Sequence, residues 1–234
     1  MCGRIAQYKG VAQYLERLDS ATPILSGYDD VPLERYNVAP STRVKVIHQL
    51  VNGLVVASVK WGWQPFWAKG KMPPPINARV EKVTQGKYFK QIWPHRALVG
   101  ADGWFEWVKD PADPKRKQPF FIRLRSTQPM FMAAIGHFPE PEAELREDDG
   151  FVILTADSAG GMIDIHDRRP IVLSAEHARE WVDPDTSLER AEELALRHGL
   201  PSEAFEWFPV DKAVGNVRNE GPQLVLPIDK GPGF

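Results

Sequence analysis

Apolar residues come in short runs along this chain, and most of the runs have the length and composition of strands. Residues 43–61 form two such runs on either side of Asn52 and Gly53. This pair predicts a β-hairpin, because both residues tolerate a positive φ. Six further runs predict strands: 97–107, 119–124, 130–138, 151–157, 205–210 and 223–227.

Helical spacing is confined to a few segments. Residues 11–18 have it, and so do 174–182 and 187–199. A capping box at Ser174 begins the second of these segments, and Gly199 is the expected C-cap of the third. Residues 85–92 are weakly helical, 70–75 form a proline-rich extended loop and 139–150 form a charged surface loop. Strands dominate and do not alternate regularly with helices. This predicts an α+β fold with an antiparallel, β-rich core of barrel-like sheets and peripheral helices.

Size and charge narrow the function classes. The chain has 234 residues, 43% of them hydrophobic, and a net charge of -2. We expect one domain over 1–234, and nucleic-acid binding would need a local basic patch. A single cysteine cannot form an internal disulfide and does not suit a structural zinc site. We therefore expect a cytoplasmic protein with no metal, cofactor, signal peptide or membrane span.

Several polar stretches interrupt the apolar runs. They are MCGR (1–4), RYNVAP (35–40), INARVE (76–81), DGWFEW (102–107), HDRRP (166–170) and VGNVRN (214–219). Each stretch alone permits a structural interpretation. Cys2 could be a small buried residue, Asn37 and Asn77 could cap turns, Glu106 could point outward from a strand, and His166 could be a hydrogen-bonded core histidine.

Together and in this order, these stretches resemble the SRAP (SOS response-associated peptidase) family. The resemblance runs from Cys2 to about Asn219, and the tail at 229–234 has no counterpart in it. It implies an SRAP-like domain that senses abasic sites in single-stranded DNA.

The position of Cys2 suits this chemistry. Removal of Met1 would leave a free α-amine beside the thiol. An abasic deoxyribose opens to an aldehyde, with which the amine can form a Schiff base. The thiol can then close a thiazolidine ring, which an internal cysteine cannot do. A cation such as Arg4 would favour the thiolate.

The resemblance also implies roles for other residues. Glu106 and His166 would be acid–base catalysts beside Cys2, and Asn77 would hold the reacting groups. The aromatic neighbours of Glu106 are expected to raise its pKa.

DNA binding is assigned by the same resemblance, to Arg4, Asn37, Pro40, Trp67, Arg79 and Arg168. The arginines would contact phosphates, although pairing with carboxylates is an open alternative. Pro40 and Trp67 would stack on bases, and a core position is an equally good interpretation of Trp67.

The sequence is also compatible with other functions. The alternative is an N-terminal-nucleophile glutamine amidotransferase, in which the free amine is the base and the thiol attacks an amide. A third possibility is a DNA-binding module without catalysis. Self-reversal of the adduct, strand-lyase activity and autoproteolysis are further possible activities. We expect a monomer.

Overall fold

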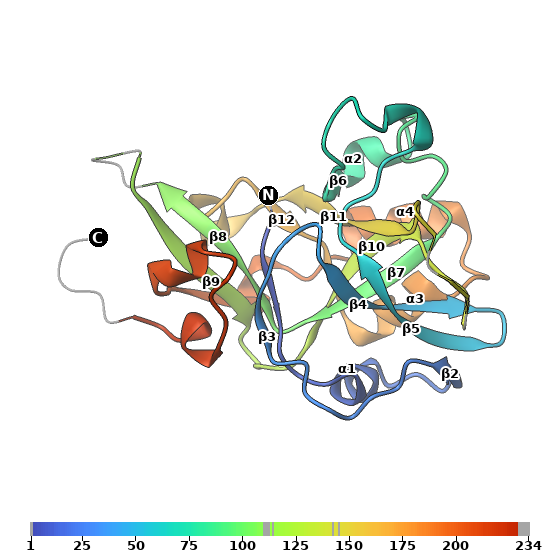
Figure 1. The fold of residues 1–234 in the computed structure, drawn as a ribbon, viewed down its shortest axis with the longest axis horizontal. Helices are drawn as coiled ribbons and strands as arrows, with labels where there is room; N and C mark the ends of the chain where they lie inside the picture. The colour runs from blue at the N-terminus through green and yellow to red at the C-terminus, as the bar shows by residue number, and fades with distance from the viewer. Residues whose placement is uncertain (1, 110–112, 114, 142, 145, 229–234) are drawn as a thin grey trace.

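The computed structural model describes residues 2–109, 113, 115–141, 143, 144 and 146–228. The tail at 229–234 lies outside them. The described strands form two open sheets, and most neighbours are antiparallel (Figure 1). The predicted α+β fold is confirmed, but the sheets do not close into a barrel.

The smaller sheet has the strand order β14-β9-β8-β1-β3. Its strands are β1 (Ile5–Gln7), β3 (Arg35–Val38), β8 (Gly103–Lys109), β9 (Lys117–Leu124) and β14 (Phe205–Pro209).

The larger sheet has the order β12-β11-β10-β7-β4-β5-β2, with β13 beside β10 and β6 beside β11. Its strands are β2 (Ile24–Ser26), β4 (Arg43–Leu50), β5 (Gly53–Lys60), β6 (Asn77–Arg79), β7 (Arg96–Ala101), β10 (Met130–His137), β11 (Gly150–Asp157), β12 (Arg168–Pro170) and β13 (Val172–Leu173). The expected hairpin is confirmed, since β4 and β5 pair from Arg43 opposite Lys60 to Leu50 opposite Gly53.

Successive side chains along the strands point to opposite faces of the sheet, and this alternation builds a core of several layers. In β11, Val152 and Leu154 face the helices, whereas Phe151 and Ile153 face the smaller sheet. The central strands of the larger sheet are apolar on both faces because both faces are covered. A third cluster, which includes Phe105, covers the outer face of the smaller sheet.

The helices supply one of these layers. They are α1 (Val11–Leu18), α2 (Val80–Val83), α3 (Ala175–Val182) and α4 (Leu188–Arg197). Ser174 and Ser187 cap α3 and α4, each hydroxyl accepting a bond from the backbone N–H three residues on. Short 3₁₀ turns are η1 (Phe66–Ala68), η2 (Gly160–Asp164), η3 (Ser202–Ala204), η4 (Lys212–Gly215) and η5 (Pro222–Val225). No helix of the described chain is both long and apolar enough to cross a bilayer.

Two predictions of local structure are wrong. Residues 85–92 form turns, and the short helix lies just before them, at α2. Residues 223–227 do not form a strand, because η5 covers most of them and buries only Leu224. Both segments are too short for periodicity to distinguish a helix or a strand from consecutive turns.

The apolar run at 97–107 is broken at Asp102 into β7 and β8, which belong to different sheets. The Asp102 carboxylate accepts bonds from the backbone N–H groups of Tyr8 and Lys9 and from the Tyr14 hydroxyl, at 2.7, 3.0 and 2.8 Å. Gly103 follows because a Cβ there would lie 2.6 Å from the Ile122 carbonyl oxygen. Asp102 thus fixes where β8 begins, and β8 carries Glu106.

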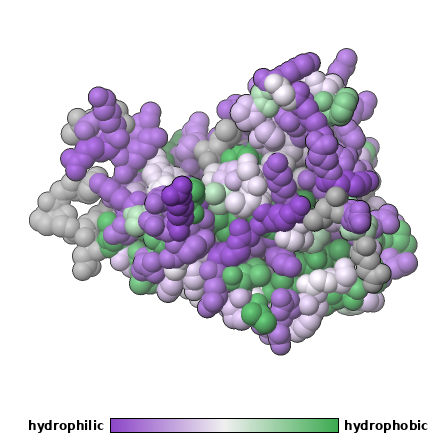
Figure 2. Space-filling model, in the orientation of Figure 1, coloured by the Kyte–Doolittle hydropathy of each residue, from purple (hydrophilic) through white to green (hydrophobic). Residues whose placement is uncertain are grey.

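One group of exposed apolar residues lies away from these polar motifs, whereas Ile163 and Val217, also exposed, lie beside or within two of them. Ile24, Leu25 and Val51 lie on the edge strand β2 and at the hairpin turn. Figure 2 shows hydrophobic residues along the lower part of the face, whereas most of the rest is hydrophilic.

Candidate active site

The polar motifs meet where the N-terminal segment enters the space between the two sheets. In Figure 1 the N-terminus lies between β8 of the smaller sheet and the β11–β12 end of the larger one. Cys2 and Glu106 come from the smaller sheet, where Ile5 pairs with Trp104 and the Phe105 N–H donates to the Arg4 carbonyl. Asn77 and His166 come from segments that flank β11.

Cys2 is held directly by Asn77. Its side chain is fully buried between the sheets. Asn77 Nδ2 donates to the Cys2 carbonyl oxygen at 2.7 Å. Asn77 is in turn placed by the parallel pairing of β6 with β11, opposite Ile153. Its Oδ1 is buried and has no hydrogen-bond partner among the described residues, so it is an acceptor still available at the site.

Glu106 points inward, contrary to the simpler strand interpretation. It is 4% exposed and lies on the same face of β8 as Trp104, which packs between the sheets. Burial raises the pKa of Glu106 to about 7, as the sequence predicted in direction. A carboxyl group with this pKa can both give and accept a proton near neutrality.

The thiol of Cys2 lies in the field of this carboxyl group. Burial raises the pKa of Cys2, and the charge of Glu106 raises it further. Arg4 lowers it through a backbone hydrogen bond, but the Arg4 guanidinium is directed elsewhere. The expectation that this guanidinium favours the thiolate is therefore wrong, and a proton acceptor is needed.

His166 lies between η2 and β12 with its ring partly exposed. The Arg168 backbone N–H donates to His166 Nδ1 at 3.0 Å. Asp167 Oδ1 lies 2.7 Å from the same nitrogen. Burial lowers the pKa of His166, so the ring is mainly neutral at physiological pH. The charge of Asp167 acts on Glu106 as well, which places the two segments near each other.

Arg4 and Asn37 form one buried network. Arg4 Nη1 donates to Asn37 Oδ1 at 2.6 Å and to the Val214 carbonyl at 2.8 Å. Asn37 Nδ2 donates to the carbonyls of Asn216 and Asn219 at 3.0 and 2.9 Å. The network joins the motifs at the two ends of the chain. These contacts organise the site from within, and a direct contact of either residue with DNA stays a prediction.

Arg168 is also buried, at 5% exposure. Its guanidinium donates to both oxygens of Glu81 at 2.9 and 3.0 Å and also pairs with Asp157. It donates to the Thr155 carbonyl at 2.6 Å as well. This is the carboxylate-pairing alternative, and phosphate contact by Arg168 stays a prediction. Glu81 was not among the predicted site residues, although it lies within the INARVE motif.

The remaining DNA-binding candidates lie at the surface. Arg79 is exposed, and its side chain has no ion pair or hydrogen bond within the part of the chain that is described. Trp67 is 57% exposed, so the core alternative is wrong, and its ring packs edge-on against Tyr88. Pro40 is partly exposed. Phe66, which was not among the predicted site residues, is exposed next to Trp67 in the sequence.

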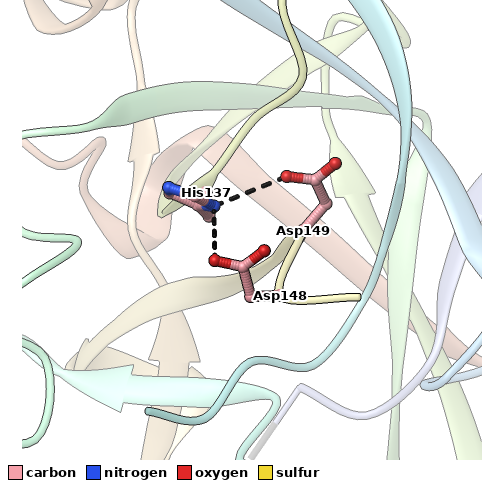
Figure 3. A group of neighbouring side chains, drawn as sticks. All are labelled: His137, Asp148 and Asp149. Atoms are coloured by element: carbon pink, nitrogen blue, oxygen red, sulfur yellow. Dashed lines mark ion pairs between the residues drawn. The ribbon is translucent and has the colours of Figure 1, made fainter. Parts of the chain in front are cut away.

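A second polar cluster lies at the opposite end of β11. His137 Nδ1 is 3.2 Å from Asp148 and 3.5 Å from Asp149 (Figure 3). One ligand atom of each residue lies within 4.8 Å of the others, which is a possible arrangement for a metal ion. The Arg146 guanidinium, however, is 3.1 Å from the same imidazole nitrogen and 3.4 Å from Asp149. The Arg146 guanidinium already balances the charge of this cluster, so a metal ion would have to displace it.

Known proteins resemble this chain over most of its length. A family model described as SOS response associated peptidase (SRAP) matches residues 1–217. The abasic site processing protein YedK of Escherichia coli (strain K12) is 45% identical over 229 residues, which cover 97% of this chain and 100% of that protein. The abasic site processing protein YoaM of Bacillus subtilis (strain 168) is 28% identical and covers 96% and 97% of the two chains.

Two crystal structures share the fold. A phage-related protein from Bordetella bronchiseptica has a TM-score of 0.74 and 41% identity, over 90% of this chain and 95% of that one. A protein from Bacteroides thetaiotaomicron has a TM-score of 0.75 and 20% identity, over 97% and 100% of the two chains. The two architectures agree although little of the second sequence is shared.

Proposed function

Because this chain belongs to the SRAP (SOS response associated peptidase) family, we propose that it acts on abasic sites in single-stranded DNA through a covalent bond to Cys2. The observation that carries the proposal is the site around Cys2. Asn77 binds the Cys2 backbone, and the charge of Glu106, whose pKa is about 7, acts on the thiol.

The reaction begins once Met1 has been removed. The α-amine of Cys2 attacks the aldehyde carbon of the opened sugar, and loss of water leaves an imine. The thiol sulfur then adds to the imine carbon, and its proton passes to the nitrogen. The product is a five-membered thiazolidine, and no oxidant or metal takes part.

Glu106 supplies the proton transfers at the first stage. Its protonated form gives a proton to the ring oxygen of the closed sugar, which opens to the aldehyde. Its ionised form can accept the proton of the Cys2 thiol, whose high pKa otherwise keeps it neutral. Asn77 Oδ1, the unpaired acceptor, can hold the amine or a sugar hydroxyl in place.

His166 acts at the imine stage, where protons move as the thiazolidine closes or reopens. If the same steps run backward, the protein releases itself from DNA. A proton removed from the carbon next to the imine would instead eliminate the 3′ phosphate and cut the strand, which is lyase activity. Autoproteolysis would release Met1 and expose the amine.

DNA is held by the exposed residues. Arg79 is available for a phosphate, and Trp67 with Phe66 and Pro40 offers apolar surface on which bases can stack. Arg4, Asn37 and Arg168 stabilise the loops around the site, and their contact with phosphate would require their present bonds to rearrange. With a net charge of -2, binding should be modest and sensitive to salt.

The test is a denaturing gel after incubation with single-stranded DNA that carries one abasic site. We expect a covalent band with the processed protein and none with Cys2→Ala, which should still bind DNA reversibly. A heat-stable adduct formed by Cys2→Ala would refute the thiazolidine. Glutaminase activity without a band would support the amidotransferase alternative, and salt-sensitive binding with neither would support a non-catalytic module.

The free amine can be tested separately from the thiol. An extra N-terminal residue that is not removed keeps the thiol and converts the amine of Cys2 to an amide. Crosslinking should then fail, and mass spectrometry of the native protein should show Met1 missing. Crosslinking at the normal rate by a chain that retains Met1 would contradict this part of the proposal.

A further inference from the structure

Glu81 links two segments of the active site that are far apart in the sequence. It lies on α2, two residues after Arg79, and α2 follows directly from β6 with its Asn77. Its two carboxylate oxygens accept bonds from Nη1 and Nη2 of Arg168, at 2.9 and 3.0 Å. Such a two-point contact fixes the orientation of both groups, not only their distance.

Arg168 in turn controls the surroundings of His166. It is the first residue of β12, and its backbone N–H is not used in the sheet but donates to His166 Nδ1. Near this end of the strand, the Arg168 side chain is anchored by the Thr155 carbonyl, by Asp157 and by Glu81. Thr155 and Asp157 belong to β11, which already pairs with β12. Glu81 is the anchor from a different element.

Two groups contact the Nδ1 atom of His166, and they favour opposite protonation states of this nitrogen. The Arg168 N–H needs an unprotonated nitrogen with a free lone pair. The Asp167 carboxylate, 2.7 Å away, favours a proton on the same nitrogen. The position of the Arg168 backbone therefore influences which of the two ring nitrogens of neutral His166 carries the proton.

We propose that Glu81 is a positioning residue: by holding the Arg168 guanidinium, it keeps the Arg168 N–H on His166 Nδ1 and so leaves the proton on Nε2. The Nε2–H group is then the one that can donate to the reacting imine. For its effect on reaction rates, this inference rests on the proposed function. Its effect on the histidine ring does not.

The first measurement uses the protein without DNA. Ring ¹⁵N NMR of His166 should show Nε2 protonated and Nδ1 unprotonated. In Glu81→Gln the ion pair is lost, and the signals should move toward the form protonated on Nδ1, facing Asp167. Asp157→Asn is the matched control, because Asp157 pairs with the same guanidinium but its side chain is 83% exposed and lies on the neighbouring strand. This control should keep the signals of the unmodified protein.

The second measurement follows single-turnover formation and release of the DNA adduct. Glu81→Gln should slow release by about 10-fold, since small displacements of a proton donor cost about this much or more. Initial DNA binding and its salt slope should not change. Glu81→Asp keeps the charge and should restore the ring signals and most of the release rate. If Glu81→Gln does not fold, Glu81→Ala, which also lacks the charge, takes its place in both measurements.

Two results would overturn the inference. Unchanged His166 signals in Glu81→Gln would show that Glu81 does not set the ring. Tighter DNA binding by Glu81→Gln with unchanged ring signals would mean that Glu81 instead occupies a phosphate position on Arg168. If no variant and not even the unmodified protein forms an adduct, the proposed function is wrong, and the NMR comparison still decides the role of Glu81.

Discussion

Glu106 should make the protein less stable as pH rises, and its replacement by glutamine should remove this effect. Burial raises its pKa from 4.5 to about 7, so the folded state favours the protonated carboxyl group. Below pH 4.5 the group is protonated in both the folded and the unfolded state, so its burial carries no charge-related cost in folding free energy. Above pH 7 it is ionised in both, and the full penalty of burying a charge applies.

The size of the penalty follows from the two pKa values. At ~1.36 kcal/mol per pKa unit, the interval from 4.5 to about 7 corresponds to about 3 kcal/mol. Because Glu106 is 4% exposed, solvent screening reduces this value little. Glu106→Gln keeps the size and cannot ionise. Relative to the unmodified protein, it should therefore gain about 2.5 kcal/mol of stability between pH 5 and pH 8.

The assay is urea denaturation of both proteins at pH 5 and pH 8. Taking the difference between proteins at each pH cancels the titration of every other group that the substitution leaves unchanged. In the same variant, adduct formation at pH 7 should slow by about 10²–10⁴-fold if general acid–base catalysis carries sugar opening. The loss should be small on a substrate that already presents an open aldehyde.

Two outcomes would refute this reasoning. Stability curves that stay parallel from pH 5 to pH 8 would mean that Glu106 has an ordinary pKa. A stability gain without any loss of rate would mean that the buried carboxyl group is not used in the reaction. The expected combination, greater stability with lower activity, is typical of a catalytic group held in an unfavourable environment.

Three further substitutions test separate parts of the structure. Arg79→Ala should weaken DNA binding and reduce the salt slope by about one phosphate contact; an unchanged slope in a salt titration would remove Arg79 from the DNA interface. Trp67→Ala should weaken single-strand binding by ~1–3 kcal/mol in a fluorescence titration. The melting temperature of the Trp67→Ala protein should equal that of the unmodified protein because Trp67 is 57% exposed. A large drop in melting temperature would indicate a structural role for Trp67. Asp102→Ala removes the acceptor of three hydrogen bonds and should lower the free energy of unfolding by at least about 2 kcal/mol. An unchanged free energy of unfolding in urea denaturation would show that water replaces the carboxylate.

Local features of this protein could be predicted from the sequence alone. The hairpin at Asn52-Gly53, the helix α3 with its cap at Ser174, the helix α4 and the strand-rich α+β class depend on residues close together in the chain, and all are confirmed. The family was also evident, because the order of six motifs does not depend on how they fold, and the family-model match confirms it.

The tertiary structure decided how each motif residue is used. Arg4, Arg79 and Arg168 look equivalent in the sequence, yet one is exposed and two are buried against partners from distant segments, such as Val214 and Glu81. The raised pKa of Glu106 arises from burial between two sheets, and the break of the apolar run at Asp102 depends on Tyr8, Lys9 and Tyr14. Burial and hydrogen-bond partners are properties of the folded neighbourhood, and residues nearly a hundred positions away supply that neighbourhood.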